Sequence, residues 1–234
     1  MSVRYVGKDI PRNDGFDKVT GRGVFTFDVH LPRMLHGKIL RSPYAHAKVL
    51  SIDTSAAEAL PGVRAVCTFE NTTAKLWNGA APMFITPLPH KPVLDQTIFT
   101  GEPKYIGDEV AGVAADTEEI AAQAVKLIRV EWQQLPAVYD PLEAVKPDAP
   151  QVQPRFANPE YNNICGGPVI LTFGGDPDEA FKHCDEVVEY RVKLPRVKQA
   201  QMETHGAVAS YCPDGRLDVI STTQAPYPTK MILA

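Results

Sequence analysis

The sequence lacks most of the features that mark specialised classes of protein. No run of apolar residues reaches the ~20 positions that a membrane-spanning helix needs. The 24 lysines and arginines are outnumbered by 28 aspartates and glutamates, and the resulting net charge of −4 gives no electrostatic reason to expect nucleic acid or an anionic membrane as a partner. The N-terminus has no apolar segment typical of a signal peptide, so we expect a cytoplasmic location.

Motifs for metal binding and for self-contained catalysis are also missing. The four cysteines lie more than three residues apart, which excludes a CxxC site and favours reduced thiols over a disulfide scaffold. The six histidines form no HExxH spacing, and the chain has no GxSxG elbow, GxGxxG motif or Walker loop. We therefore predict no metal site and no complete catalytic constellation within this chain.

What is abundant is proline, with 21 residues that divide the chain into short elements. Residues 1–17 are polar and read as an extended arm, and residues 71–107 read as a long loop. Alternating or continuously apolar segments predict strands at 23–28, 36–41, 48–52, 63–68, 110–115 and 129–132. Thr54 and Thr117 are placed to cap helices over 55–60 and over 118 to about 128, so the order 110–132 is β-α-β.

A second unit follows a stretch rich in proline and asparagine, residues 146–168, which we expect to be a connection without regular structure. Asp176 precedes Pro177 and Glu179, a pattern that predicts a capped helix reaching about Cys184. Further on, the pattern predicts a strand at 186–193, a hairpin of 207–212 and 217–221, and a helix at 227–234. No cap follows that helix, so we expect a piece of a longer polypeptide or one part of a divided one.

Several of these segments resemble one known family. Residues in the first unit are similar to the hammerhead domain of the xanthine dehydrogenase/aldehyde oxidase family, which opens its molybdenum-binding subunit. Those segments are Val19–Gly23, Leu40–Ala47 (LRSPYAHA), Ile52–Val63, Ile106–Ala115 (IGDEVAGVAA) and Ile128–Trp132. Three segments of the second unit resemble the start of the next, molybdopterin-binding domain: Phe173–Phe181, Gln201–Glu203 and Ser221–Pro226.

The resemblance implies an α+β fold, with a hammerhead-like domain followed by an incomplete mixed α/β molybdopterin-binding domain. It implies an N-terminal arm at 1–17, the hammerhead domain at 18–145, a linker at 146–168 and the start of the molybdopterin-binding domain at 169–234. Relatives hydroxylate a carbon of a heterocycle or aldehyde with water as the oxygen source. Electrons pass from molybdenum through two [2Fe–2S] clusters to FAD, often on separate subunits.

The site residue that the resemblance implies is Gln224, which corresponds to the glutamine that hydrogen-bonds an oxo ligand of the molybdenum in the family. An amide donor can hold such a group without adding charge or competing as a ligand. The family's Gly-Gly-Phe-Gly loop and its base glutamate both lie beyond this chain, so no catalytic residue is assigned here. Gln199 stands where many relatives carry histidine, and it removes a titratable group from that position.

Three functions follow as hypotheses. The first is the N-terminal portion of a molybdenum hydroxylase large subunit, inactive and free of cofactor when alone. Its expected partners are a C-terminal molybdopterin-binding portion or subunit, an iron–sulfur subunit, an FAD subunit and a small-molecule substrate. The second is a non-catalytic docking or assembly module that uses the hammerhead surface. The third, a small enzyme working alone, needs a nucleophile, base and stabiliser that the sequence does not show.

Overall fold

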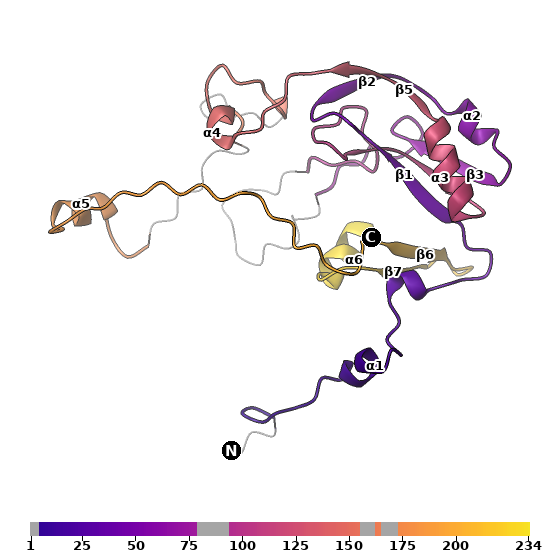
Figure 1. Ribbon diagram of the computed structural model, residues 1–234, viewed down its shortest axis with the longest axis horizontal. Helices are drawn as coiled ribbons and strands as arrows, with labels where there is room; N and C mark the ends of the chain where they lie inside the picture. Colours follow the sequence, from indigo (N-terminus) through magenta and orange to yellow (C-terminus); the bar gives the residue numbers. More distant parts are fainter. Residues whose placement is uncertain (1–4, 79–93, 155–161, 165–172) are drawn as a thin grey trace. The chain divides into compact units, whose positions relative to one another are not determined.

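The computed structural model describes residues 5–78, 94–154, 162–164 and 173–234 (Figure 1). The chain divides into two compact units, which we describe separately. The larger unit comprises Arg33–Pro195 and Ala225–Ala234, and the smaller comprises Met1–Pro32 and Arg196–Gln224. Both contain small antiparallel sheets with short helices, as expected for the α+β class. Within the described residues, no helix is long and apolar enough to cross a membrane.

The larger unit is organised around strand β4 (Glu109–Ala115), which lies between β1 (His36–Arg41) and β3 (Val63–Thr68). Both pairings are antiparallel. The continuously apolar sequence of β4 predicts a strand covered on both faces, and its Val110 and Ala111 are fully buried. The sequence therefore identifies the central strand of this sheet correctly.

At one position of β4, a glycine leaves space for a neighbouring aromatic ring. Gly112 faces Phe99 so closely that a Cβ atom at residue 112 would lie 2.8 Å from Phe99 Cζ. Such a contact is shorter than van der Waals packing allows, so the absence of a side chain is what admits the ring.

A second, two-stranded ribbon joins β2 (Ala47–Asp53) to β5 (Arg129–Gln134) in antiparallel pairing. All three elements of the predicted β-α-β order at 110–132 are present, but β4 and β5 pair with different partners. The helix between them therefore links two antiparallel sheets and is not the crossover of a parallel pair.

Helix α3 (Glu118–Leu127) covers the three-stranded sheet and packs on β1, β4 and the short helix α2 (Ser55–Glu58). Its Ala121 and Ala124 are fully buried, and side chains this small let helix and sheet approach closely. The buried apolar cluster that results consists of Ala57, Val66, Ala111, Val113, Ala124 and Ile128.

The two predicted helix caps behave differently. Thr117 Oγ1 accepts a hydrogen bond from the backbone N–H of Ile120, as predicted for α3. Thr54 occupies the corresponding position of α2, but its hydroxyl donates to Glu58 and caps no backbone group. Asp53 takes the capping role, because its Oδ1 accepts from the Ser55 backbone N–H at 3.0 Å. Thr54 therefore stands at the predicted N-cap position, but its side chain makes no capping hydrogen bond.

Two expectations for the N-terminal residues are also wrong. The predicted strand at 23–28 is replaced by a 3₁₀ turn, η1 (Thr26–Asp28), because Asp28 Oδ2 accepts the Phe25 backbone N–H at 2.9 Å and closes the chain locally. The predicted arm at 1–17 is not extended throughout, since α1 (Gly15–Val19) begins within it.

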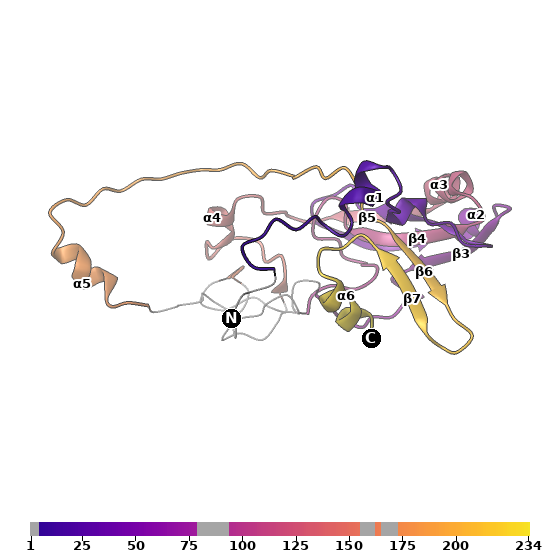
Figure 2. The same cartoon turned by 90° about the horizontal axis from the view of Figure 1, so that it is seen from below.

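The C-terminal elements follow the predictions at most points. Hairpin strands β6 (Ala207–Tyr211) and β7 (Leu217–Ser221) lie side by side in Figure 2. They pair antiparallel, with Ala207 opposite Ser221 and Tyr211 opposite Leu217. Helix α5 (Pro177–Lys182) is capped by Asp176, as predicted, and ends two residues early. Helix α6 (Pro226–Leu233) is also present.

Two features on either side of the predicted linker differ from expectation. A short helix, α4 (Pro141–Ala144), is absent from the predictions; Asp140 caps it by accepting the Leu142 backbone N–H at 2.8 Å. The predicted strand at 186–193 does not form, because these residues have no neighbouring strand in the described part of the chain. The described residues of the connection, 146–154 and 162–164, form no helix or strand, and the rest of 146–168 lies outside the described residues.

The contrast between the two threonines predicts unequal effects on stability. Thr117→Ala should lower the free energy of unfolding of the larger unit by about 1 kcal/mol, because one N-terminal amide of α3 loses its acceptor. Thr54→Ala, the matched control, should change it by less than about 0.5 kcal/mol. Denaturant unfolding followed by tryptophan fluorescence measures this, since Trp77 and Trp132 both lie in this unit. Equal losses would contradict the capping assignment.

Candidate functional site

Two family-like segments of the larger unit, Leu40–Ala47 and Ile106–Ala115, are joined directly. The Ser42 backbone N–H donates to the Asp108 carbonyl at 2.9 Å, and the Gly107 N–H donates back to the Ser42 carbonyl at 2.8 Å. Arg41 Nη1 adds a bond of 2.7 Å to the Gly107 carbonyl and pairs with Glu109. These motifs therefore form a structural junction at the end of β1 and the start of β4.

The carboxylate of Asp108 is held inside this junction. Its Oδ2 accepts the Lys104 backbone N–H at 2.9 Å, and its Oδ1 accepts the Glu109 N–H at 3.1 Å. Burial raises the pKa of Asp108, and burial together with the nearby carboxylates raises the pKa of Tyr105 to about 12. The contacts of both side chains therefore lie within the loop itself.

His46 is the buried histidine of the LRSPYAHA segment. Its Nδ1 lies 2.7 Å from the Pro136 carbonyl, so this nitrogen donates and the ring ties the start of β2 to the chain after β5. Its Nε2 is buried, lacks a hydrogen-bond partner among the described residues, and lies 3.8 Å from Glu102 Oε1. Lys104, 2.6 Å from the same oxygen, lowers the pKa of Glu102. The described contacts of His46 are therefore one hydrogen bond to the backbone and the proximity of Glu102.

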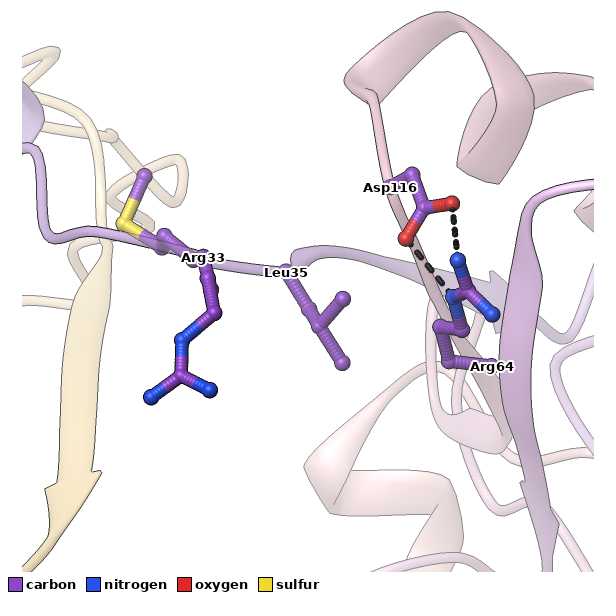
Figure 3. A pocket seen from close by; sticks show the side chains of 5 residues that line it. Arg33, Leu35, Arg64 and Asp116 are labelled. Atoms are coloured by element: carbon purple, nitrogen blue, oxygen red, sulfur yellow. Dashed lines mark hydrogen bonds and ion pairs between the residues drawn. The ribbon is translucent and has the colours of Figure 1, made fainter.

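A shallow hollow of about 570 Å³ lies elsewhere on the larger unit (Figure 3). Arg64 closes one side through two hydrogen bonds of 2.7 Å to Asp116, and this pairing lowers the pKa of Asp116. The guanidinium of Arg33 points away from that pair. The lining residues are Arg33, Met34, Leu35, Arg64 and Asp116. None of these five residues is a nucleophile or an unpaired base.

The predicted site residue, Gln224, lies just past the end of the hairpin in the smaller unit. Thr222 extends the pairing beyond β7: its N–H donates to the Gly206 carbonyl at 3.0 Å, and its Oγ1 accepts the Gly206 N–H at 3.0 Å. Gln224 follows two residues later, with an exposed side chain that makes no hydrogen bond to the described part of the chain. The amide is therefore carried near a fixed strand end and is free to contact another molecule.

The N-terminal segment supports the same strand end. The Thr26 backbone N–H donates to Glu203 Oε1 at 3.3 Å, and the Phe27 ring rests on Gly206. A Cβ at residue 206 would lie 2.8 Å from Phe27 Cε2. Sequence reasoning misses this contact, because the pattern of residues 23–28 predicts a strand; the only local signal is Asp28, three residues after Phe25.

The other residues singled out near Gln224 do not form a metal site. Met202 is fully exposed, and Gln201 Nε2 lies 3.4 Å from His205 Nε2. Among the described residues, no group of three or more histidine, cysteine, aspartate or glutamate side chains could hold a metal ion. Gln224 therefore offers a neutral hydrogen-bond donor, and the described residues add no ligand set to it.

Comparison with known families agrees with both halves of this description. Residues 20–136 match the aldehyde oxidase and xanthine dehydrogenase a/b hammerhead domain, and residues 159–234 match the molybdopterin cofactor-binding domain. The chain belongs to the xanthine dehydrogenase/aldehyde oxidase family, and it corresponds to the N-terminal region of the large subunit.

Individual relatives give the same correspondence. The chain is 36% identical over 223 residues to a probable xanthine dehydrogenase subunit of Bacillus subtilis, covering 95% of this chain and 28% of the relative. It is 34% identical over 230 residues to the carbon monoxide dehydrogenase large chain of Hydrogenophaga pseudoflava, covering 92% and 27%. A crystal structure of the Cu,Mo-CO dehydrogenase in its carbon monoxide reduced state is 30% identical with a TM-score of 0.77, covering 97% and 29%. The chain thus spans between a quarter and a third of these proteins.

The contact beneath the Gln224 hairpin can be tested by adding one methyl group. Gly206→Ala should displace Phe27 and destabilise the smaller unit by ~1–3 kcal/mol, the usual penalty of overpacking. The Thr26 amide should then exchange its hydrogen faster, as measured by NMR. Gly23→Ala is the matched control, because its Cβ would meet Phe25 at an ordinary 3.7 Å.

A second substitution makes this test specific. Trimming the ring with Phe27→Leu in the Gly206→Ala background should restore part of the lost protection at Thr26. Full protection in Gly206→Ala alone would mean that Phe27 does not pack on the hairpin.

Proposed function

We propose that this chain supplies the N-terminal part of the large subunit of a molybdenum-containing hydroxylase that oxidises a heterocycle, an aldehyde or a related small molecule. The observation that carries the proposal is the order of two matched domains, hammerhead then molybdopterin-binding, with Gln224 exposed in the second. The relatives include a probable xanthine dehydrogenase subunit and a carbon monoxide dehydrogenase large chain, and these support the proposed reaction class. The chain is inactive without the remaining molybdopterin-binding portion.

The division of the chain is part of the same proposal. We assign the arm to residues 1–17, the hammerhead domain to 18–145, the linker to 146–168 and the start of the molybdopterin-binding domain to 169–234. The matches at 20–136 and 159–234 support two domains in this order. The dense junction of Arg41 and Ser42 with residues 107–109 then belongs to the hammerhead scaffold, and the Gln224 hairpin to the cofactor side.

The residues present fit one contact to a molybdopterin cofactor, and not its whole binding site. Gln224 has a free amide on a pinned strand end, and a neutral N–H donor can hold an oxygen of such a group without changing the charge of the site. When bound, the cofactor supplies the two-electron oxidation of the substrate. The role of this chain is to position that donor before the cofactor binds, so that little reorganisation is needed during reaction.

The partners follow from the division of labour within the family. The chain needs the C-terminal molybdopterin-binding portion, either as a continuation or as a separate subunit, to complete the cofactor site. Iron–sulfur and FAD subunits or domains are proposed as electron acceptors, since the described part of this chain holds no cluster of cysteines or other metal ligands. The competing hypothesis, a docking or assembly module without catalysis, is separated from this one by the molybdenum content of the assembled complex.

The role of Gln224 predicts a loss of rate without a loss of metal. In the assembled enzyme, Gln224→Ala should reduce turnover per molybdenum roughly 10²-fold, near the lower end of what removal of one preorganised donor costs. Molybdenum content should fall little, because the amide is not a ligand. Steady-state kinetics normalised to metal analysis measures both quantities.

A matched control is Gln133→Ala, which removes an exposed glutamine from β5 in the other unit and should leave turnover unchanged. Full turnover with full metal loading in Gln224→Ala would show that Gln224 has only a structural role. Destabilised folding would be detected as a shift in the thermal transition, which we do not expect from an exposed side chain.

The isolated 234-residue chain should hold no stoichiometric molybdenum. A single neutral donor cannot supply the affinity that a large anionic cofactor requires, and the described residues offer no further ligand group. Metal analysis of the purified chain, with and without its C-terminal partner, gives the answer. One molybdenum per isolated chain would contradict the proposal that the cofactor site is shared.

A further inference from the structure

The hairpin that carries Gln224 ends in a residue pair with unusual hydrogen bonds. In an antiparallel ladder, every second pair of residues exchanges both of its backbone hydrogen bonds. The Cys212 N–H donates to the Arg216 carbonyl at 2.8 Å, so the exchanging pairs recur at every second residue from that point along β6 and β7. Gly206 and Thr222 form the last pair of this series, and the Thr222 N–H donates to the Gly206 carbonyl at 3.0 Å, as the ladder requires.

The reciprocal bond of this pair departs from the ladder. In a continuing strand the Gly206 N–H would donate to the Thr222 carbonyl, but here it donates to the Thr222 hydroxyl oxygen at 3.0 Å. The same hydroxyl donates to the Gly206 carbonyl at 3.3 Å. Thr222 therefore makes three hydrogen bonds to Gly206, and its side chain takes the place of its own carbonyl. The chain can leave the ladder at this pair while the Gly206 amide keeps an acceptor.

The chain does turn away directly after this pair. Strand β7 ends at Ser221, and Gln224 lies at a bend two residues after Thr222. The conformation of Thr222 therefore decides in which direction the backbone of Gln224 leaves the hairpin. Threonine suits this position because a β-branched side chain has few χ1 rotamers, so a hydroxyl bonded to Gly206 also restricts the backbone that carries it.

The other member of the pair is fixed from a separate direction. The Phe27 ring lies so close to Gly206 that a Cβ atom there would be 2.8 Å from Phe27 Cε2. Glu203, three residues earlier, accepts the Thr26 backbone N–H at 3.3 Å. The N-terminal segment thus holds Gly206 in place, and the three bonds to Thr222 pass this constraint on to the residues before Gln224.

We infer that Thr222 is a positioning residue for Gln224: its hydroxyl closes the final pair of the hairpin, ends the strand and fixes the point from which the Gln224 amide is presented. The inference rests on the proposed function, because Gln224 is the donor proposed above for the cofactor. In this role Thr222 acts through the backbone of Gln224 and not on the cofactor. Its contribution is preorganisation, since a donor held before binding needs little rearrangement during reaction.

The first test removes the hydroxyl while keeping the shape of the side chain. In the assembled enzyme, Thr222→Val should lower turnover per molybdenum about tenfold, less than Gln224→Ala, because the amide is still present but is held less well. Thr222→Ser, which keeps the hydroxyl, should stay within about threefold of the parent enzyme. Equal losses in the valine and serine variants would overturn the inference, because the hydroxyl would then not be what matters.

A matched control is Thr20→Val in the same unit. It also removes a threonine hydroxyl that hydrogen-bonds the backbone, to the Phe16 carbonyl at 2.7 Å, but it does so at the end of α1. Turnover per molybdenum should not change in this variant. A tenfold loss in Thr20→Val would overturn the inference, because any weakening of the unit would then slow the reaction.

A double-mutant cycle tests whether Thr222 acts through Gln224. In the Gln224→Ala background, adding Thr222→Val should change turnover per molybdenum by less than about twofold, because the donor that it positions is already gone. A residue with only a structural role would cause the same tenfold loss in both backgrounds. Such an additive result would overturn the inference.

Hydrogen exchange tests the geometry without any cofactor. In the free 234-residue chain, the Gly206 amide should exchange at least about fivefold faster in Thr222→Val than in the parent, because it loses its acceptor, and Thr222→Ser should restore slow exchange. NMR relaxation should show greater mobility of the Gln224 backbone in the valine variant alone. Unchanged exchange and mobility in Thr222→Val would overturn the inference.

The two sets of measurements separate this inference from the proposed function. Full turnover in Gln224→Ala, together with faster Gly206 exchange in Thr222→Val, overturns the proposed role of Gln224 and supports Thr222 as the residue that fixes the strand end. Reduced turnover in Gln224→Ala, together with full turnover in Thr222→Val, overturns only the inference about Thr222.

Discussion

The burial of β4 between two antiparallel neighbours is the constraint on which the larger unit depends. A strand that is apolar on both faces can be covered only if a sheet flanks it and other elements close the two sides. Helix α3 closes one side, and its Ala121 and Ala124 allow a close approach to the sheet. The junction of Arg41 and Ser42 with the residues before β4 then sets where the strand begins. The positions of the neighbouring elements follow from the need to exclude solvent from β4.

The candidate site obeys the opposite rule. Gln224 is exposed, and the role proposed for it requires a backbone that is held in place while the side chain stays free to bind. The reciprocal bonds between Thr222 and Gly206 hold the strand end, and Phe27 supports Gly206 from below. The family-like segments therefore fall into two kinds. Those of the hammerhead domain form hydrogen bonds with one another, whereas the segment that contains Gln224 exposes an amide N–H donor to solvent.

Sequence alone predicts the elements whose pattern is decided by burial. Strands β1 to β5, helix α3 and the β6–β7 hairpin all have periodic apolar residues with breakers beside them, and all are present. The errors occur where a local hydrogen bond, or the lack of a neighbouring strand, determines the conformation of the segment. Asp28 turns the chain at a predicted strand, Asp53 takes the cap expected of Thr54, and residues 186–193 keep a strand's sequence without a strand's partner.

The site itself could not be derived from residue chemistry, because a single exposed glutamine has no signature. Its identification depends on the resemblance of Ser221–Pro226 to a family, and that assignment stays a prediction. The support beneath it could not be anticipated either, since the contact of Phe27 with Gly206 joins residues nearly 180 positions apart. Local patterns carry no information about pairs separated so widely in the chain.

The meeting of Gly112 and Phe99 has a consequence for how such domains diverge. The Phe99 ring occupies the space that a side chain at residue 112 would need, so the sizes of these two residues are coupled. Neither can enlarge alone, and loss of the ring alone leaves a cavity against the central strand. Lineages that replace Gly112 should therefore also carry a smaller residue at position 99. The combined side-chain volume of the two positions would then stay about the same.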